Sequence, residues 1–290
     1  MLSVGSIFSY IQFFLGVLWQ FITHPIRASR NSVLMLSIFL RTIVVGRRAS
    51  RVLAYHGADC SFLYPRRQQW NMKTRRRYIW RVAQLFWAPW IIKRAGLRLD
   101  IVGDEKVNEV RSHIVVSNHE STIDSIIYVA VLKNGCYVVK KEILLYPIIG
   151  RVALLGAQII IDRKNRPQAM AAIRESVDVR IIPRRQSWQN SNLIFFAEGT
   201  RTPDGSLGPF KMGAFRIACE AKLPILPIAV TGTYEALPKG SLLRLKKRPK
   251  IRVEFGDALY PCGNDAADLM RRTRDAIALM IAKNTFQPSL

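Results

Sequence analysis

Short β-rich segments alternate with helix-like segments from Leu97 to Gly256, and this alternation limits the fold more than any other feature. The strand-like runs are LRLDIVG, SHIVVSN, CYVVKKE, AQIIIDR, NLIFFAEGT, LPILPIAVTG and KIRVEFG, and the helix-like runs include STIDSIIYVAVL, RPQAMAAIRESVDVR and MGAFRIACEAK. Strands that alternate with helices are typical of α/β domains. We therefore predict an α/β domain over residues 97–290, with a largely parallel sheet flanked by helices. Ligands of such sheets gather outside the carboxyl ends of the strands.

The first fifty residues are apolar enough to reach a membrane. Val4–Ile22 contains no charged side chain, and a helix of this length just crosses a hydrocarbon core about 30 Å thick. Ser32–Leu40 is too short to span, and arginines follow the first segment, beginning with Arg27. The positive-inside rule puts those arginines on the cytoplasmic side. We expect residues 1–50 to form membrane-anchoring helices, as one span or a hairpin, with a buried core helix as the alternative.

Residues 51–96 form a basic, tryptophan-containing region. Between Arg27 and Arg94 there are 15 basic residues and one acid, Asp59, within a chain of net charge +24. Such a field attracts nucleic acid or an anionic membrane. Trp80 and its neighbouring tryptophans are interleaved with arginines among bulky aliphatic residues, which favours a helix at the headgroup level of a bilayer. No known nucleic-acid motif appears, so we expect a membrane and no nucleic acid as the partner.

The segment SNHESTID, residues 117–124, places His119 directly after a predicted strand and Asp124 five positions later. Residues five apart on one continuous helix point in directions roughly 140° apart. The two side chains can meet if His119 lies in the loop and Asp124 in the first turn of the helix that follows. The carboxylate would then fix the imidazole tautomer and leave the other ring nitrogen as a general base.

A second polar segment, FFAEGTRTPDGSLGPFKMGAF, follows another predicted strand. Glu198 ends the strand, Gly199 permits a tight turn, and Thr200 and Arg201 supply hydrogen-bond donors. The Arg201 guanidinium could bind a phosphate through two hydrogen bonds; a solvated surface loop is the alternative. Further cations stand near predicted strand ends: Lys140, Lys141 and Arg163.

Four motifs occur in the order and approximate spacing of the glycerolipid acyltransferase family. They are Asn118-His119-x4-Asp124, Ile161-Asp162-Arg163, Phe196-Ala197-Glu198-Gly199-Thr200-Arg201 and Leu223-Pro224-Ile225-Leu226-Pro227. From Leu97 to Gly256 the chain resembles a lysophosphatidate acyltransferase. Ala197 stands where the family usually has proline, and the basic stretch from Val179 to Ser191 looks longer than the family's usual connection.

The resemblance implies transfer of a fatty acyl group from acyl-CoA or acyl-carrier protein to the free sn-2 hydroxyl of a lysophospholipid, without an acyl-enzyme. His119 would deprotonate that hydroxyl and Asp124 would orient His119. The phosphate-binding set would be Glu198, Gly199, Thr200, Arg201, Lys140 and Arg163. We expect no cofactor and no metal ion, since the four cysteines are scattered without a ligand spacing. The partners would be the bilayer, the lysophospholipid and the acyl donor.

Two other functions remain open at this stage. An esterase or thioesterase could use the same histidine and aspartate to activate water. Within the acyltransferases, the acceptor could be a lysolipid with another headgroup. The Arg201 loop favours a transferase for lysophosphatidate, because a guanidinium suits a phosphomonoester.

Overall fold

The computed structural model describes residues 80, 83–109, 113–132, 135–145, 153, 158–180, 192–240 and 250–285. The predicted anchor, residues 1–50, lies outside the described residues, as do residues 51–79 and the basic stretch after Arg180. Within the described ranges, no helix has both the length and the apolar character needed to cross a bilayer.

Seven strands form one sheet, in the order β1-β7-β6-β2-β5-β3-β4. Neighbours pair in parallel except β6 and β7, which are antiparallel. The prediction of a largely parallel sheet flanked by helices is thus confirmed, with β1 and β7 reversed relative to the other five strands. The strand bounds are β1 Arg98–Val102, β2 Ile114–Ser117, β3 Gly135–Lys140, β4 Ile159–Ile161, β5 Asn192–Phe196, β6 Ile225–Thr231 and β7 Lys250–Phe255.

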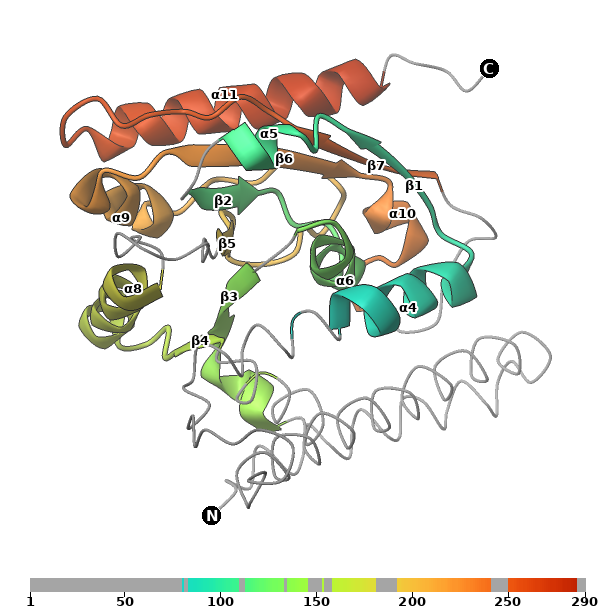
Figure 1. The fold of residues 1–290 in the computed structure, drawn as a ribbon, viewed down its shortest axis with the longest axis horizontal. Coiled ribbons are helices and arrows are strands. Elements are labelled where there is room, and N and C mark those ends of the chain that lie inside the picture. Colours follow the sequence, from blue (N-terminus) through green and yellow to red (C-terminus); the bar gives the residue numbers. More distant parts are fainter. Residues whose placement is uncertain are drawn as a thin grey trace, which may run out of the picture.

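Helices cover both faces of the sheet (Figure 1). One face is covered by α8 (Arg166–Arg180), α9 (Gly213–Ala221) and α11 (Ala266–Thr285), and the other by α4 (Ala88–Ala95), α6 (Thr122–Val131) and α10 (Thr233–Ala236). Shorter elements are the π-helical turn η1 (Ala83–Trp87), α5 (Lys106–Glu109) and the 3₁₀ turn η2 (Lys141–Leu145).

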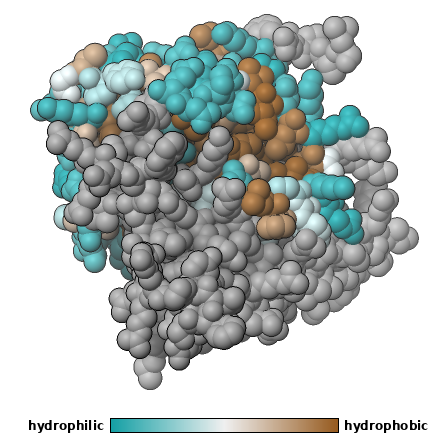
Figure 2. Space-filling view, in the orientation of Figure 1, coloured by the Kyte–Doolittle hydropathy of each residue, from teal (hydrophilic) through white to brown (hydrophobic). Residues whose placement is uncertain are grey.

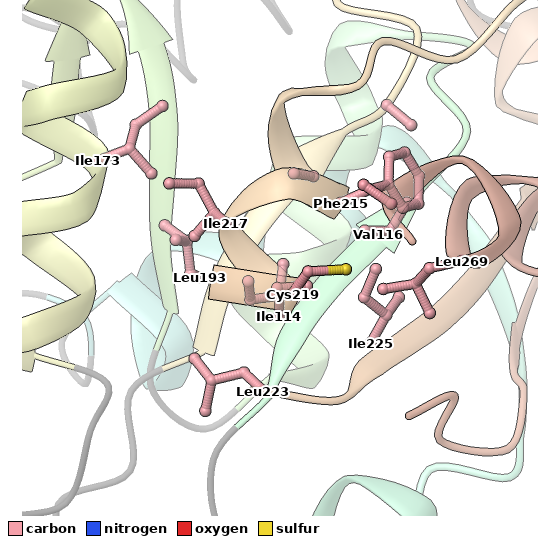
Figure 3. Close-up of a cluster of buried hydrophobic side chains, with 14 of the residues drawn as sticks. Ile114, Val116, Ile173, Leu193, Phe215, Ile217, Cys219, Leu223, Ile225 and Leu269 are labelled. Carbon is pink, nitrogen blue, oxygen red and sulfur yellow. The ribbon is translucent and has the colours of Figure 1, made fainter. Parts of the chain in front are cut away.

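The two-sided covering explains the sequence of the central strand β2. Ile114 and Val116 contribute to the core beneath α9 and α11, whereas Val115 contributes to the core beneath α6, and all three are fully buried. A strand buried on both faces is apolar along its whole length rather than alternating. Figure 3 shows the first of these cores, where Phe215 and Ile217 of α9 pack over β2.

Trp80 differs from its predicted interfacial position. Its side chain is buried, its indole Nε1 donates a hydrogen bond to the Leu132 carbonyl at 2.9 Å, and its ring lies 5.7 Å from that of Tyr137. A tryptophan whose N–H has a buried acceptor belongs to the protein core. Trp80 therefore belongs to the core on the α6 face of the sheet, and the exposed apolar side chains nearby are Leu85 and Phe86.

On the face shown in Figure 2, a strip of apolar side chains lies among hydrophilic ones. Apolar side chains on the edge strand β1 also remain exposed, namely Ile101 and Val102. None of the described strands pairs with the outer edge of β1.

Candidate active site

Three polar loops meet at one edge of the sheet because β5, β2 and β6 are parallel and adjacent. The strands end at Phe196, Ser117 and Thr231. Two residues beyond these ends stand Glu198, His119 and Thr233, respectively. The carboxyl edge of the sheet therefore gathers side chains that lie up to 114 positions apart in the sequence.

His119 and Asp124 are in direct contact. His119 lies in the loop after β2, and Asp124 lies in the first turn of α6, which is the arrangement the spacing requires. The distance from His119 Nδ1 to Asp124 Oδ2 is 2.8 Å. Because an ionised carboxylate only accepts hydrogen bonds, Nδ1 carries the hydrogen and Nε2 keeps its lone pair. The His119 side chain is 16% exposed, which leaves part of the ring accessible to a substrate.

The position of Asp124 is fixed by the start of α6. Ser121 is the N-cap of that helix, and Asp124 completes a capping box in which the Ser121 amide donates to Asp124 Oδ2 at 2.8 Å. The Glu120 amide donates to the same oxygen at 2.8 Å. A capping box satisfies amides that a helix start leaves unpaired. The same carboxylate therefore begins the helix and holds His119.

The second oxygen of Asp124 has a partner from across the sheet. The Thr233 hydroxyl donates to Oδ1 at 2.6 Å, and both residues are fully buried. Both oxygens of the carboxylate thus have donors, which hold it in one orientation beside His119. Asp124 is thus equipped to stabilise an imidazolium at His119.

The imidazole of His119 is stacked on Phe196, the last residue of β5. The ring centroids are 3.8 Å apart and the ring planes differ by 14°. Tyr137 stacks in turn on Phe196, with the centroids 6.2 Å apart. These aromatic rings fix the plane of the imidazole while Asp124 fixes its rotation.

Glu198 joins the histidine loop to the loop after β5. The His119 amide donates to Glu198 Oε1 at 3.0 Å, and the Gly208 amide donates to Oε2 at 3.3 Å. The Thr202 amide donates back to the His119 carbonyl at 2.8 Å. Burial raises the pKa of Glu198 above its ordinary value, while the hydrogen bonds from the His119 and Gly208 amides oppose the rise. The observed contacts of the Glu198 carboxylate are with the backbone.

Arg201 reaches the start of α6, where its Nη1 donates to Thr122 Oγ1 at 3.0 Å. Gly199 has φ +69°, and a Cβ there would lie 2.8 Å from Nζ of Lys211. Lys239 Nζ donates to Thr200 Oγ1 at 3.3 Å. The turn at residues 199–201 is therefore bordered by cationic side chains.

Arg163 joins this group, and Lys140 stands beside it. Arg163 Nη1 donates to the Gly199 carbonyl at 2.7 Å, although Arg163 follows a different strand. Lys140 is exposed at the end of β3, which adjoins β5. Its neighbour Lys141 forms an ion pair with Asp162. The structure thus brings Arg163 into contact with the turn and leaves Lys140 at the same sheet edge.

Sequence reasoning missed several contributors, including Phe196, Glu120 and Thr233. Thr233 follows β6 and lies 109 positions from Asp124, so no local pattern links the two. The pairing of β2 with β6 is the signal that joins them, and it is visible only in the fold. Among the described residues, no group of three or more His, Cys, Asp or Glu side chains is placed to hold a metal ion.

The fold and the site define an acyltransferase domain. Residues 98–231 match the family model described as Acyltransferase, and this part of the chain belongs to that family.

Two named relatives indicate which acyltransferases the chain resembles. The chain is 38% identical over 147 residues to 1-acyl-sn-glycerol-3-phosphate acyltransferase of Limnanthes alba, covering 50% of each chain. It is 32% identical over 179 residues to 1-acyl-sn-glycerol-3-phosphate acyltransferase beta of Homo sapiens, covering 60% of each chain. The match therefore spans about half to three fifths of these relatives.

A solved structure shares the fold. The crystal structure of the 1-acyl-sn-glycerophosphate acyltransferase PlsC from Thermotoga maritima superposes with a TM-score of 0.71 at 21% identity, covering 91% of this chain and 100% of that one. At this identity the likeness shows the architecture alone.

Proposed function

We propose that this protein transfers a fatty acyl group from acyl-CoA or acyl-carrier protein to the free sn-2 hydroxyl of lysophosphatidate, giving phosphatidate for phospholipid synthesis. The observation that carries the proposal is the hydrogen bond between His119 Nδ1 and Asp124 Oδ2, formed beside the arginine-bearing turn at residues 199–201. The names of the relatives support the acceptor.

The reaction needs a base on the acceptor hydroxyl. His119 Nε2 takes the proton as the hydroxyl oxygen attacks the thioester carbonyl carbon, so a C–O bond forms while the C–S bond breaks. The imidazolium then returns the proton to the departing thiolate. Asp124 stays ionised throughout and stabilises the imidazolium. No side chain is acylated, and no cofactor takes part.

The phosphate of the acceptor would lie against the turn at residues 199–201. Arg201 and Arg163 are the guanidinium groups there, and their fixed forks suit two hydrogen bonds to phosphate oxygens. Lys140 adds charge from the end of β3. Gly199 and Thr200 shape the turn, and Glu198 ties it to the His119 loop. Glu198 would thus contribute to phosphate binding through the shape of the loop.

Both proposed substrates are amphiphiles, so the enzyme would work at a bilayer. Val4–Ile22 would anchor it there, and the basic residues that follow would keep the α/β domain on the cytoplasmic face. A lysolipid could then slide from the leaflet toward His119 while its acyl tail stays in lipid.

Acyl transfer with controls tests the proposal. Membranes that contain wild type, His119→Ala or Arg201→Ala are given labelled acyl-CoA, with and without lysophosphatidate. We expect phosphatidate from wild type, a loss of about a hundredfold or more in His119→Ala, and a raised KM for the acceptor in Arg201→Ala. An Arg216→Ala variant, on the charged surface of α9, serves as the matched loss of one arginine.

Three results would change the proposal. Thioester consumption at an equal rate without an acceptor would make the protein a thioesterase. A preference for a lysolipid with another headgroup would keep the transferase and change its substrate. Full activity in His119→Ala would remove the general-base mechanism altogether.

A further inference from the structure

A buried hydroxyl lies between two buried carboxyl groups next to His119. Thr233 Oγ1 is 2.6 Å from Asp124 Oδ1 and 3.2 Å from Glu120 Oε2. Thr233 and Asp124 are fully buried, and Glu120 is 6% exposed. A hydrogen-bonded chain, His119–Asp124–Thr233–Glu120, thus runs from the accessible imidazole into the protein.

The hydrogens in this chain can be counted. A hydroxyl has one hydrogen to donate, and the shorter contact assigns it to Asp124, whose other oxygen takes the His119 hydrogen. The contact between Thr233 and Glu120 then needs a hydrogen from Glu120. Glu120 supplies one only in its protonated form, with Oε2 donating to Thr233 Oγ1.

The surroundings of Glu120 favour that form. Burial raises the pKa of Glu120 to about 7, and the nearby Asp124 charge adds to the rise, while hydrogen bonds from the backbone amides of Tyr234 and Thr233 oppose it. The Tyr234 amide donates to Oε2 at 3.0 Å, which a protonated carboxyl oxygen can still accept. Two ionised carboxylates that share one hydroxyl hydrogen would repel each other.

We propose that Thr233 is a positioning residue for the His119–Asp124 pair, and that protonated Glu120 holds the Thr233 hydroxyl in the direction of Asp124. This inference rests on the proposed function of that pair. Both oxygens of the Asp124 carboxylate then have donors that oppose its rotation: Oδ2 accepts from His119 and two amides, and Oδ1 accepts from Thr233.

The consequence for catalysis is a fixed imidazole. If Oδ1 loses its donor, the carboxylate can rotate toward other partners, and the His119 ring loses its orientation for the acceptor hydroxyl. A small misplacement of a catalytic group is costly in rate. The phosphate contacts proposed for the turn at residues 199–201 do not include Thr233, so the loss should fall on kcat and not on KM.

The test compares Thr233→Val, which keeps the shape and removes the hydroxyl, with Thr233→Ser, which restores it. We expect Thr233→Val to lower kcat about tenfold to a hundredfold, as loss of a hydrogen bond to a charged group does, with the KM of both substrates within about twofold. Thr233→Ser should recover most of the rate. Thr233→Ala gives the same comparison if the valine variant does not fold. Wild-type kcat in Thr233→Val, or a serine variant no better than it, would overturn the proposal.

A second pair of variants tests Glu120. Glu120→Gln carries an amide nitrogen that can donate to Thr233, although this nitrogen cannot accept from the Tyr234 amide as Glu120 Oε2 does. Glu120→Ala can do neither. We expect glutamine to recover most of the kcat that alanine loses. If glutamine is as inactive as His119→Ala, Glu120 acts in its ionised form and the proposed chain is wrong.

A measurement without substrate separates this inference from the proposed function. The chain has four histidines, so ¹⁵N-histidine labelling of the full protein gives few ring signals, and His119→Ala assigns one of them. Thr233→Val should shift the Nδ1–H signal of His119, and Thr233→Ser should return it. An unchanged signal would overturn the positioning role even if wild type transfers acyl groups. A shifted signal in a protein without acyltransferase activity would uphold the chain and reject the reaction.

Discussion

The ring of Phe196 lies parallel to the ring of His119, with the centroids 3.8 Å apart. Phe196 is the last residue of β5, and it joins the core of the α6 face, whereas its neighbour Phe195 joins the opposite core. One strand end therefore provides both a support for the imidazole and a matched position without that contact.

Replacement of Phe196 should affect the rate more than the fold. We expect Phe196→Leu to lower kcat about tenfold, because the imidazole loses the surface that fixes its plane. Phe195→Leu removes the same volume from the other face and should leave kcat within about twofold. Steady-state kinetics with thermal unfolding of both variants checks this. Equal kcat values for the two leucine variants would show that the stack has no role in positioning His119.

A methyl group at position 135 should disrupt the packing of the Trp80 ring against Gly135. A Cβ at Gly135 would lie 2.0 Å from the Trp80 ring, so either β3 or the indole must move. We expect Gly135→Ala to lower the free energy of unfolding by about 1–3 kcal/mol. Gly213→Ala is the control, since a Cβ there meets nothing within 4 Å. If the clash is the cause, Gly135→Ala should lower the unfolding free energy by less in a Trp80→Ala background, because the effects of substitutions at residues in contact are not additive.

Asn118 continues the pairing of β2 with β6 through its side chain. Its Nδ2 donates to the Val230 carbonyl at 2.7 Å, and the Val230 amide donates to its Oδ1 at 2.9 Å. Asn118→Ala leaves both backbone groups of Val230 buried without these partners, so we expect a loss of about 2 kcal/mol or more in unfolding free energy. Asn108→Ala, at an exposed position of α5, should change it by less than about 0.5 kcal/mol. Urea unfolding distinguishes them, and similar values would show that water replaces the asparagine.

The ionisation of Glu120 should make stability depend on pH. Burial raises its pKa from 4.5 to about 7 in the folded protein, so the folded state binds the proton more tightly than the unfolded state. The contribution of Glu120 protonation to the unfolding free energy is fully present below pH 4.5. It is lost as the pH rises through about 7, by about 3 kcal/mol in all. Glu120→Gln lacks this loss.

The measurement is the difference in unfolding free energy between Glu120→Gln and wild type across pH 4 to 8.5. The difference should move in favour of glutamine between about pH 4.5 and 7 and level off above that range. Subtraction removes the titration of all other groups that behave alike in both proteins. A difference that is constant with pH would mean that Glu120 keeps its ordinary pKa.

Local sequence patterns identified most of the sheet and one half of the site. The strand-like runs ended where polar residues begin, and the five-residue spacing from His119 to Asp124 required a loop followed by a helix start, as found. Both features depend on residues close together in the chain. The antiparallel pairing of β7 with β6 was not indicated, because strand direction depends on connections that the sequence does not specify.

The remainder of the site depends on contacts between distant residues. Thr233 reaches Asp124 only because β6 lies beside β2, and Arg163 reaches Gly199 only because the ends of β4 and β5 share an edge. The basic neighbours of Trp80 in the sequence predict an interfacial position, but its indole donates to the buried Leu132 carbonyl. Helix α11 was not recognised, since its many charged residues obscure the apolar stripe that packs on β6.

The double use of Asp124 gives a way to observe the site without a substrate or a label on any side chain. The amide hydrogens of Glu120 and Ser121 are both donated to Asp124 Oδ2. Their exchange with deuterated solvent therefore requires these hydrogen bonds to the carboxylate to break. Slow exchange at these two positions would report an assembled catalytic pair, and fast exchange a loosened one. Amide exchange at the beginning of α6 thus reports whether Asp124 holds His119 in its catalytic orientation.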